Sequence, residues 1–66
     1  MNIRKSMRIA MAQCEINQQE LAVASGVSEV TISNISRGKG NPTMETISKL
    51  AKATDYNLGA FISLGE

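Results

Sequence analysis

Gly26 stands between two short stretches that carry the pattern of α-helices, and it constrains the fold more than any other residue. A glycine can adopt the left-handed conformation that ends a helix without the steric penalty of a side chain. Before it, Asn17 is a suitable N-cap for a helix over residues 18–25. After it, Ser28 is a suitable N-cap for a helix over about 28–36. The sequence therefore predicts two short helices joined by a tight turn.

The rest of the chain also has a helical pattern. Apolar residues recur every three or four positions near the N-terminus, which predicts an amphipathic helix over about 2–13. The letters GKGNP are typical of a loop. Thr43 then caps an expected helix over about 43–53, and Asn57 caps a short fifth helix. Because no segment alternates with a period of two, we predict an all-α, compact five-helix domain that spans residues 1–66.

The composition excludes several classes of protein. With 66 residues, one cysteine and no histidine, the chain can form neither a disulfide framework nor a Cys/His zinc site. The cysteine, Cys14, ends the apolar stripe of the first helix, where we expect a buried small hydrophobic residue rather than a redox switch. No apolar run approaches the roughly 20 residues that span a membrane, and the N-terminal residues lack the apolar stretch of a signal peptide. We therefore expect a cytoplasmic protein without membrane contact.

The charges are nearly balanced in total but uneven along the chain. Seven Lys and Arg against six Asp and Glu leave a formal net charge of +1, which by itself does not point to nucleic acid. The acids are scattered singly, whereas basic residues gather at the start of the chain and around one glycine, namely Arg4, Lys5 and Arg8, then Arg37 and Lys39. A nearly neutral total is compatible with a basic face.

The second helix of the pair has an unusual outer face. Successive residues of a helix are about 100° apart, so a helix that turns Ile32 and Ile35 to the core exposes Val30, Ser33, Asn34 and Arg37. A purely structural helix usually covers its outside with Lys and Glu, whereas Val, Ser and Asn are mediocre helix formers. This composition favours contact with another molecule, although a solvated face of an ordinary helical hairpin is the alternative.

The same side chains suit the major groove of DNA. Asn34 can pair with adenine and Val30 can touch a thymine methyl group. Ser33 can bond to either strand, and Glu29 can accept from a cytosine amino group. Basic residues at the end of the helix and in the following loop suit phosphates better, namely Arg37 and Lys39.

The stretch QQELAVASGVSEVTISNISRGKGNP, residues 18–42, resembles the helix-turn-helix of the phage Cro and repressor family, the xenobiotic-response-element type. The later stretch ISKLAKATDYNLGAFI, residues 47–62, is similar to the fourth and fifth helices of that family. The resemblance implies a lambda-repressor-like DNA-binding domain with its helix-turn-helix at about residues 18–36. In such domains the second helix of the motif enters the major groove.

The resemblance also implies which residues meet DNA. Positions that face or border the bases in the family are occupied here by Ser28, Glu29, Val30, Ser33 and Asn34. Positions that contact the DNA backbone are occupied by Asn17, Gln18, Arg37, Lys39, Asn41 and Thr43.

The chain departs from the family pattern at several positions. Many relatives have Gln at the place of Glu29, where an acid that meets no cytosine is repelled by phosphate. Some relatives pair an arginine of the first helix with an acid at the end of the third. Met11 and Ser36 occupy those positions here, so we expect an apolar or neutral contact instead.

The C-terminal segment has more apolar residues than a short helix can bury in a small core, namely Leu58, Phe61, Ile62 and Leu64. In relatives this region often forms the dimer contact, so residues 57–66 are expected to support a weak homodimer. A symmetric dimer presents two recognition helices about 34–36 Å apart, one turn of DNA. The alternative is that Phe61 and Ile62 complete the core of the monomer.

We therefore predict a sequence-specific regulator of transcription that binds double-stranded DNA. A Cro-like repressor of a phage or prophage that reads an inverted-repeat operator is the expected type. A domain that fills the chain from its first residue leaves no room for an effector domain, which favours simple occlusion of a promoter. The alternative is an antitoxin-like protein-interaction module that also binds its own promoter. Neither paired acids in a cleft nor a nucleotide-binding phosphate loop is present, so we expect no enzyme, cofactor, metal or small-molecule ligand.

Overall fold

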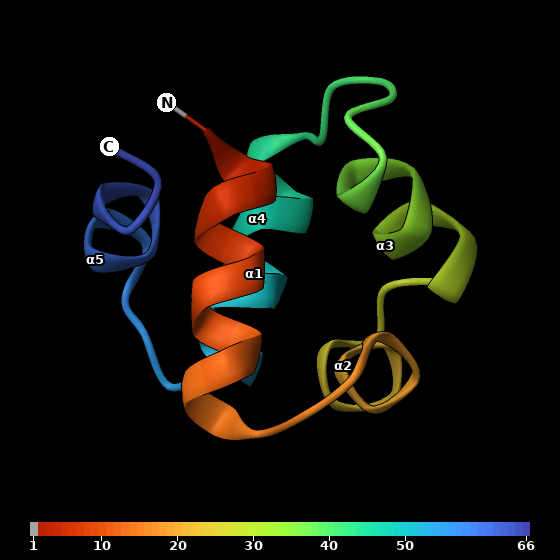
Figure 1. The fold of residues 1–66 in the computed structure, drawn as a ribbon, viewed down its shortest axis with the longest axis horizontal. Coiled ribbons are helices and arrows are strands. Elements are labelled where there is room, and N and C mark those ends of the chain that lie inside the picture. Colours follow the sequence, from red (N-terminus) through yellow and green to blue (C-terminus); the bar gives the residue numbers. More distant parts are fainter. Residues whose placement is uncertain (1) are drawn as a thin grey trace.

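A computed structural model describes residues 2–66, and Met1, the first residue of the predicted domain, lies outside them. The described residues form five α-helices and no β-strand: α1 (Ile3–Cys14), α2 (Gln18–Ser25), α3 (Glu29–Ser36), α4 (Met44–Ala53) and α5 (Leu58–Ser63). The prediction of an all-α, five-helix domain is confirmed (Figure 1). In this part of the chain, no helix combines the length and the apolar character that are needed to cross a membrane.

Each helix begins at a polar residue whose side-chain oxygen accepts a hydrogen bond from the backbone N–H three positions on. The five residues are Asn2, Asn17, Ser28, Thr43 and Asn57. The cap of α2 is a reciprocal capping box. Glu20 N donates to Asn17 Oδ1 at 2.8 Å, and Asn17 N donates to Glu20 Oε1 at 3.0 Å. Because these caps satisfy N–H groups that the helix itself leaves free, local sequence decides where the helices begin.

The hydrophobic core is built from all five helices. In Figure 1, α1 crosses the middle of the molecule with α4 behind it, α5 on one side, and α2 and α3 on the other. Each of the helices α2 to α5 contributes one or two of the largest fully buried apolar side chains, which are Leu21, Ile32, Ile47, Leu50 and Phe61. From α1, Met7 and Ala10 complete the cluster. This arrangement holds α3 at the edge of the molecule, with one face free.

The expected burial of Cys14 is wrong. Its side chain is exposed, and Sγ lies 3.6 Å from the carbonyl oxygen of Thr54, at the end of α4. The buried residues of α1 extend only from Ile3 to Ala10, and Met11 is already half-buried. Because Cys14 is the last residue of α1, it follows the helical pattern but lies beyond the part of the helix that the core covers.

The C-terminal helix divides its apolar residues between the core and the surface. Phe61 is completely buried in the core, so its side chain does not reach the surface at which the predicted dimer contact would form. The other three residues of that prediction are half-buried and pack against the core from outside: Leu58, Ile62 and Leu64. The next residue, Gly65, packs so closely on the start of α1 that a Cβ there would overlap the carbonyl oxygen of Asn2.

Candidate nucleic-acid interface

A tight turn at Gly26 joins α2 to α3. Gly26 has a φ of 75°, in the left-handed region, and its N–H donates to the carbonyl oxygen of Ala22 at 2.9 Å. Val27, in the turn, is buried against the core. Ser25 adds a contact that the sequence pattern does not reveal, because its hydroxyl donates to Leu21 O at 2.7 Å and accepts from Val27 N at 3.2 Å. The predicted helix-turn-helix geometry is therefore present.

The outer face of α3 is open to solvent. Ile32 and Ile35 are buried, at 0% and 5% exposed, whereas Val30 is 70% exposed. Glu29 is exposed as well, and Ser33 is half-buried. One shallow surface hollow runs along the helix. It is lined by Glu29, Val30 and Ser33 and by the exposed Arg37. Three of the five predicted base-facing residues thus share one accessible hollow, whereas Asn34 lines a separate one.

Two of the predicted base-facing residues already have partners within α3. Ser28 Oγ accepts from Thr31 N at 3.1 Å and donates to Thr31 Oγ1 at 2.8 Å, so its first role is to cap the helix. The half-buried Asn34 accepts through Oδ1 from Arg37 Nη2 at 3.3 Å. The sequence predicts a base contact for Asn34 and a phosphate contact for Arg37, but it does not predict that the two side chains contact each other. The only sequence signal for that contact is their spacing of three residues on one helix.

The loop that follows α3 brings further polar residues beside Asn34. Lys39 and Asn41 are both exposed, and they line a second small hollow together with Asn34 and Thr31. Gly38 and Gly40 have φ values of 73° and 70°, which other residues adopt at a steric cost. These two glycines turn the loop back toward α3.

The remaining predicted backbone contacts lie at two helix starts. Asn17 and Thr43 are exposed, but their side-chain oxygens are occupied as caps of α2 and α4. Gln18, the first residue of α2, is half-buried. Free N–H groups at a helix start attract anions, so these positions can contact phosphate through the backbone even where the side chain is occupied.

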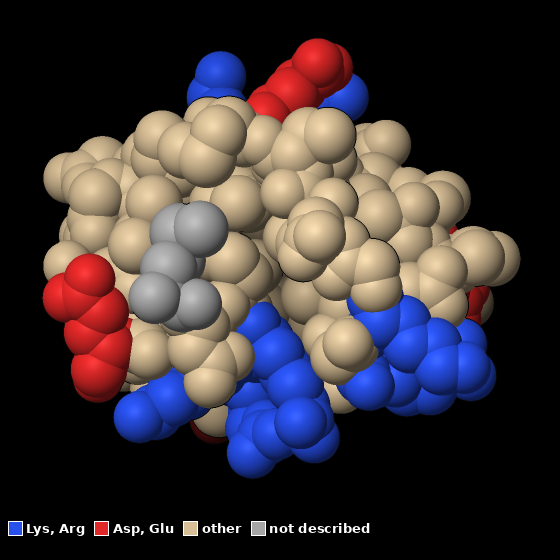
Figure 2. All heavy atoms as spheres, turned by 90° about the horizontal axis from the view of Figure 1, so that it is seen from above, with Lys and Arg blue, Asp and Glu red and all other residues tan. Residues whose placement is uncertain are grey.

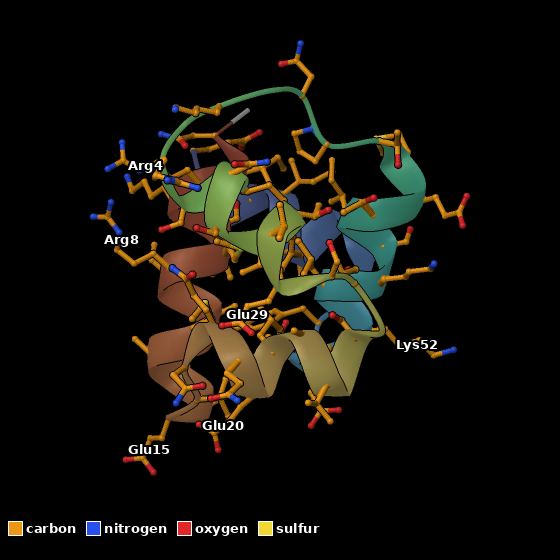
Figure 3. All side chains as sticks on the ribbon, turned by 90° about the vertical axis from the view of Figure 1, so that its right-hand side faces the viewer. Arg4, Arg8, Glu15, Glu20, Glu29 and Lys52 are labelled. Atoms are coloured by element: carbon orange, nitrogen blue, oxygen red, sulfur yellow. The ribbon has the colours of Figure 1, made fainter. Side chains whose placement is uncertain are left out.

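Basic side chains are unevenly distributed over the surface. Figure 2 shows most of the visible Lys and Arg atoms along one edge of the face that it presents, whereas the Asp and Glu atoms are spread over several places on the rim. Figure 3 looks toward α3 and α2 and shows Arg4 and Arg8 at one edge of this view, with Lys52 at the opposite edge. The single ion pair within residues 2–66 joins Lys49 Nζ to Glu45 Oε1 at 3.4 Å, and both belong to α4. The nearly neutral sequence therefore has an uneven charge distribution in space.

Comparison with known proteins identifies the family. A family model described as helix-turn-helix matches residues 7–61, a span that contains α2, the Gly26 turn, α3 and α4 completely. No curated protein has significant sequence similarity to the chain. The match covers most of the chain. The chain therefore belongs to the Cro/C1-type helix-turn-helix family and is a DNA-binding transcription regulator.

Proposed function

We propose that the protein is a Cro-like repressor that reads an inverted-repeat operator by placing α3 in the major groove. The observation that carries this proposal is the outer face of α3, which is exposed at Val30, contains no Lys within the helix, and has one long acidic side chain, Glu29, at its start. Short side chains allow a helix to approach the base edges closely. Acting in the cytoplasm on a promoter, such a repressor blocks transcription by occupying the DNA.

The proposed base contacts come from one face of α3. Asn34 pairs with adenine, Val30 contacts a thymine methyl group, and Ser33 bonds to a base of either strand. Ser28 and Glu29, at the start of the helix, border the bases. The Arg37 hydrogen bond to Asn34 is exposed, and such a bond contributes only about 1 kcal/mol net, so a base can replace it.

The proposed phosphate contacts surround that face. The starts of α2 and α4 supply backbone N–H groups near Asn17, Gln18 and Thr43. The loop after α3 supplies Lys39 and Asn41, and Arg37 turns to a phosphate when Asn34 engages a base. Contacts of this kind set the orientation of the protein on the duplex and carry no base preference themselves.

A weak homodimer through α5 completes the proposal. Leu58, Ile62 and Leu64 pack on the core from outside and keep part of their apolar surface exposed. Burial of that surface between two copies would give a two-fold dimer, as an inverted repeat requires. Phe61 supports these residues from within the core and is not itself part of the contact.

Selection of duplexes from a randomised pool at near-physiological salt, followed by sequencing, tests the proposal. We expect an inverted repeat with half-sites about 10 base pairs apart from centre to centre. The Asn34→Ala variant, selected in parallel, should lose the preference at one position in each half-site. Failure of the wild type to enrich any motif would overturn specific readout. A stable protein partner captured by the same chain in its host would then favour the antitoxin-like alternative.

A further inference from the structure

We propose that Arg4 and Arg8 of α1 bind two neighbouring phosphates of the DNA strand that passes the start of α2. The inference rests on the proposed docking of α3, and it adds α1 to the DNA-binding surface. Neither arginine lies in the helix-turn-helix, and the family resemblance assigns neither to DNA.

The two arginines lie close to the proposed docking surface. Both are exposed, and they stand four residues apart, one above the other on the same side of α1. Figure 3 shows both side chains projecting from α1 at one edge of the view, with α3 in front of the middle of the molecule. Both also line a small surface hollow that includes Gln18, the first residue of α2, and Ser36, the last residue of α3. The hollow therefore joins α1 to both helices of the motif.

The neighbours of the arginines in this hollow are neutral. Besides Gln18 and Ser36, the hollow is lined by Met7 and Met11. Within residues 2–66, the single ion pair belongs to α4 and involves neither arginine. The acid at the start of α2, Glu20, uses its carboxylate to accept from the backbone of Asn17. Both guanidinium groups are thus free to meet an external anion.

The position of this charge is unfavourable for α1 alone. Arg4, in the first turn of α1, opposes the helix dipole, and its charge repels that of Arg8 four residues further on. The first turn of α1 contains no acid that would compensate. An anionic partner removes both penalties, because it is attracted to the arginines and also to the N-terminal end of the helix.

Phosphate suits this pair of side chains. A guanidinium group presents several N–H donors in a planar fork that binds phosphate oxygens in pairs. Four residues of helix correspond to a rise of about 6 Å, so the two groups are spaced to meet separate phosphates rather than one. The strand beside the start of α2 supplies them, because Gln18 lies in the same hollow.

The salt dependence of DNA binding tests the inference. Variants Arg4→Ala, Arg8→Ala and the double variant are compared with Lys52→Ala, which removes the same charge from the opposite edge of the view in Figure 3. Each single arginine variant should weaken binding to all duplexes alike and lower the slope of log K against log salt by about 1. The double variant should lower the slope by about 2, and Lys52→Ala should leave it close to that of the wild type.

A second measurement locates the phosphates. Duplexes that carry one uncharged methylphosphonate at a time are titrated with the wild type and with Arg8→Ala. At the phosphate that Arg8 contacts, the substitution should weaken wild-type binding and leave Arg8→Ala binding nearly unchanged. Thermal unfolding serves as the control for folding, and the arginine variants should unfold at or above the wild-type temperature because they lose an unfavourable charge.

The outcomes separate the two proposals. If the wild type binds its selected operator but both arginine variants have the salt slope of Lys52→Ala, the role of α1 is wrong and the function of α3 stands. If the wild type shows no preference among duplexes, the proposed docking fails and the role of α1 fails with it.

Discussion

Arg37 Nη2 donates a hydrogen bond of 3.3 Å to Asn34 Oδ1 on the outer face of α3. The bond links a residue proposed to read a base with one proposed to hold phosphate, before any DNA is present. It engages the amide oxygen of Asn34 and leaves the amide N–H groups free to donate. Binding to adenine requires the oxygen as well, so DNA must compete with Arg37 for Asn34.

Removal of the Asn34 side chain should relax sequence preference. Asn34→Ala is expected to cost about 1–3 kcal/mol on the selected operator and much less on unrelated duplexes. Stability should not fall, because Ala is a better helix former than Asn and the lost hydrogen bond is exposed. Titration of the variant with the operator and with single-base changes measures this loss. An equal loss of affinity for every duplex would show that Asn34 does not read a base.

Removal of the Lys39 side chain, unlike that of Asn34, should lower affinity without changing sequence preference. Its side chain is exposed in the loop after α3, beside Asn41. Lys39→Ala is expected to weaken binding to all sequences alike and to lower the salt slope by about 1, because one phosphate contact disappears. Binding measured at several salt concentrations checks this. A change in base preference at constant salt slope would contradict the assignment.

The turn should require glycine at position 26 because of its left-handed backbone conformation, and not because a larger side chain would clash with neighbouring atoms. A Cβ built at this position meets no atom within 4 Å, but the φ of 75° is unfavourable for alanine. Gly26→Ala should therefore reduce the free energy of unfolding by about 1–2 kcal/mol. Gly59→Ala is the matched control, because Gly59 lies in α5 without a positive φ and should gain stability. Chemical denaturation of both variants compares them, and equal changes would refute the role of the turn.

Substitutions at the buried and at the partly exposed residues of α5 should have different effects, the first on stability and the second on dimer affinity. Phe61→Leu should lower the unfolding temperature but leave the dimer dissociation constant unchanged, because Phe61 is buried within one protomer. Ile62→Ala should raise that dissociation constant, because Ile62 keeps part of its surface exposed. Sedimentation equilibrium over a range of concentrations measures the constants. If Phe61→Leu weakens the dimer more than Ile62→Ala does, the proposed contact surface is wrong.

Much of the fold can be predicted from the sequence because it depends on neighbours along the chain. The predicted caps at Asn17, Ser28, Thr43 and Asn57 are all present, and the predicted helix boundaries agree with the observed ones within one or two residues. A cap and its partner are three residues apart, and a helix-ending glycine acts through its own φ angle. Interactions of such short range do not depend on how the helices pack.

The site was predictable to the extent that it lies on one helix. The spacing of Ile32 and Ile35 identified the buried side of α3, and the opposite side is indeed exposed at Val30. The same periodicity misplaced Cys14, because it describes directions around a helix and not how far along the helix the core extends. Burial along a helix depends on where the neighbouring helices end.

Sequence alone therefore determined the five helices, the turn at Gly26 and the outer face of α3, since local backbone chemistry and the spacing of residues along a helix control them. Tertiary structure decided which apolar residues of α5 enter the core and left Phe61 inside while Ile62 remains at the surface. It also placed Arg4 and Arg8 beside Gln18, although these residues are ten or more positions apart. The physical reason is that contacts between distant segments arise only when helices pack, and no periodicity along the chain encodes them.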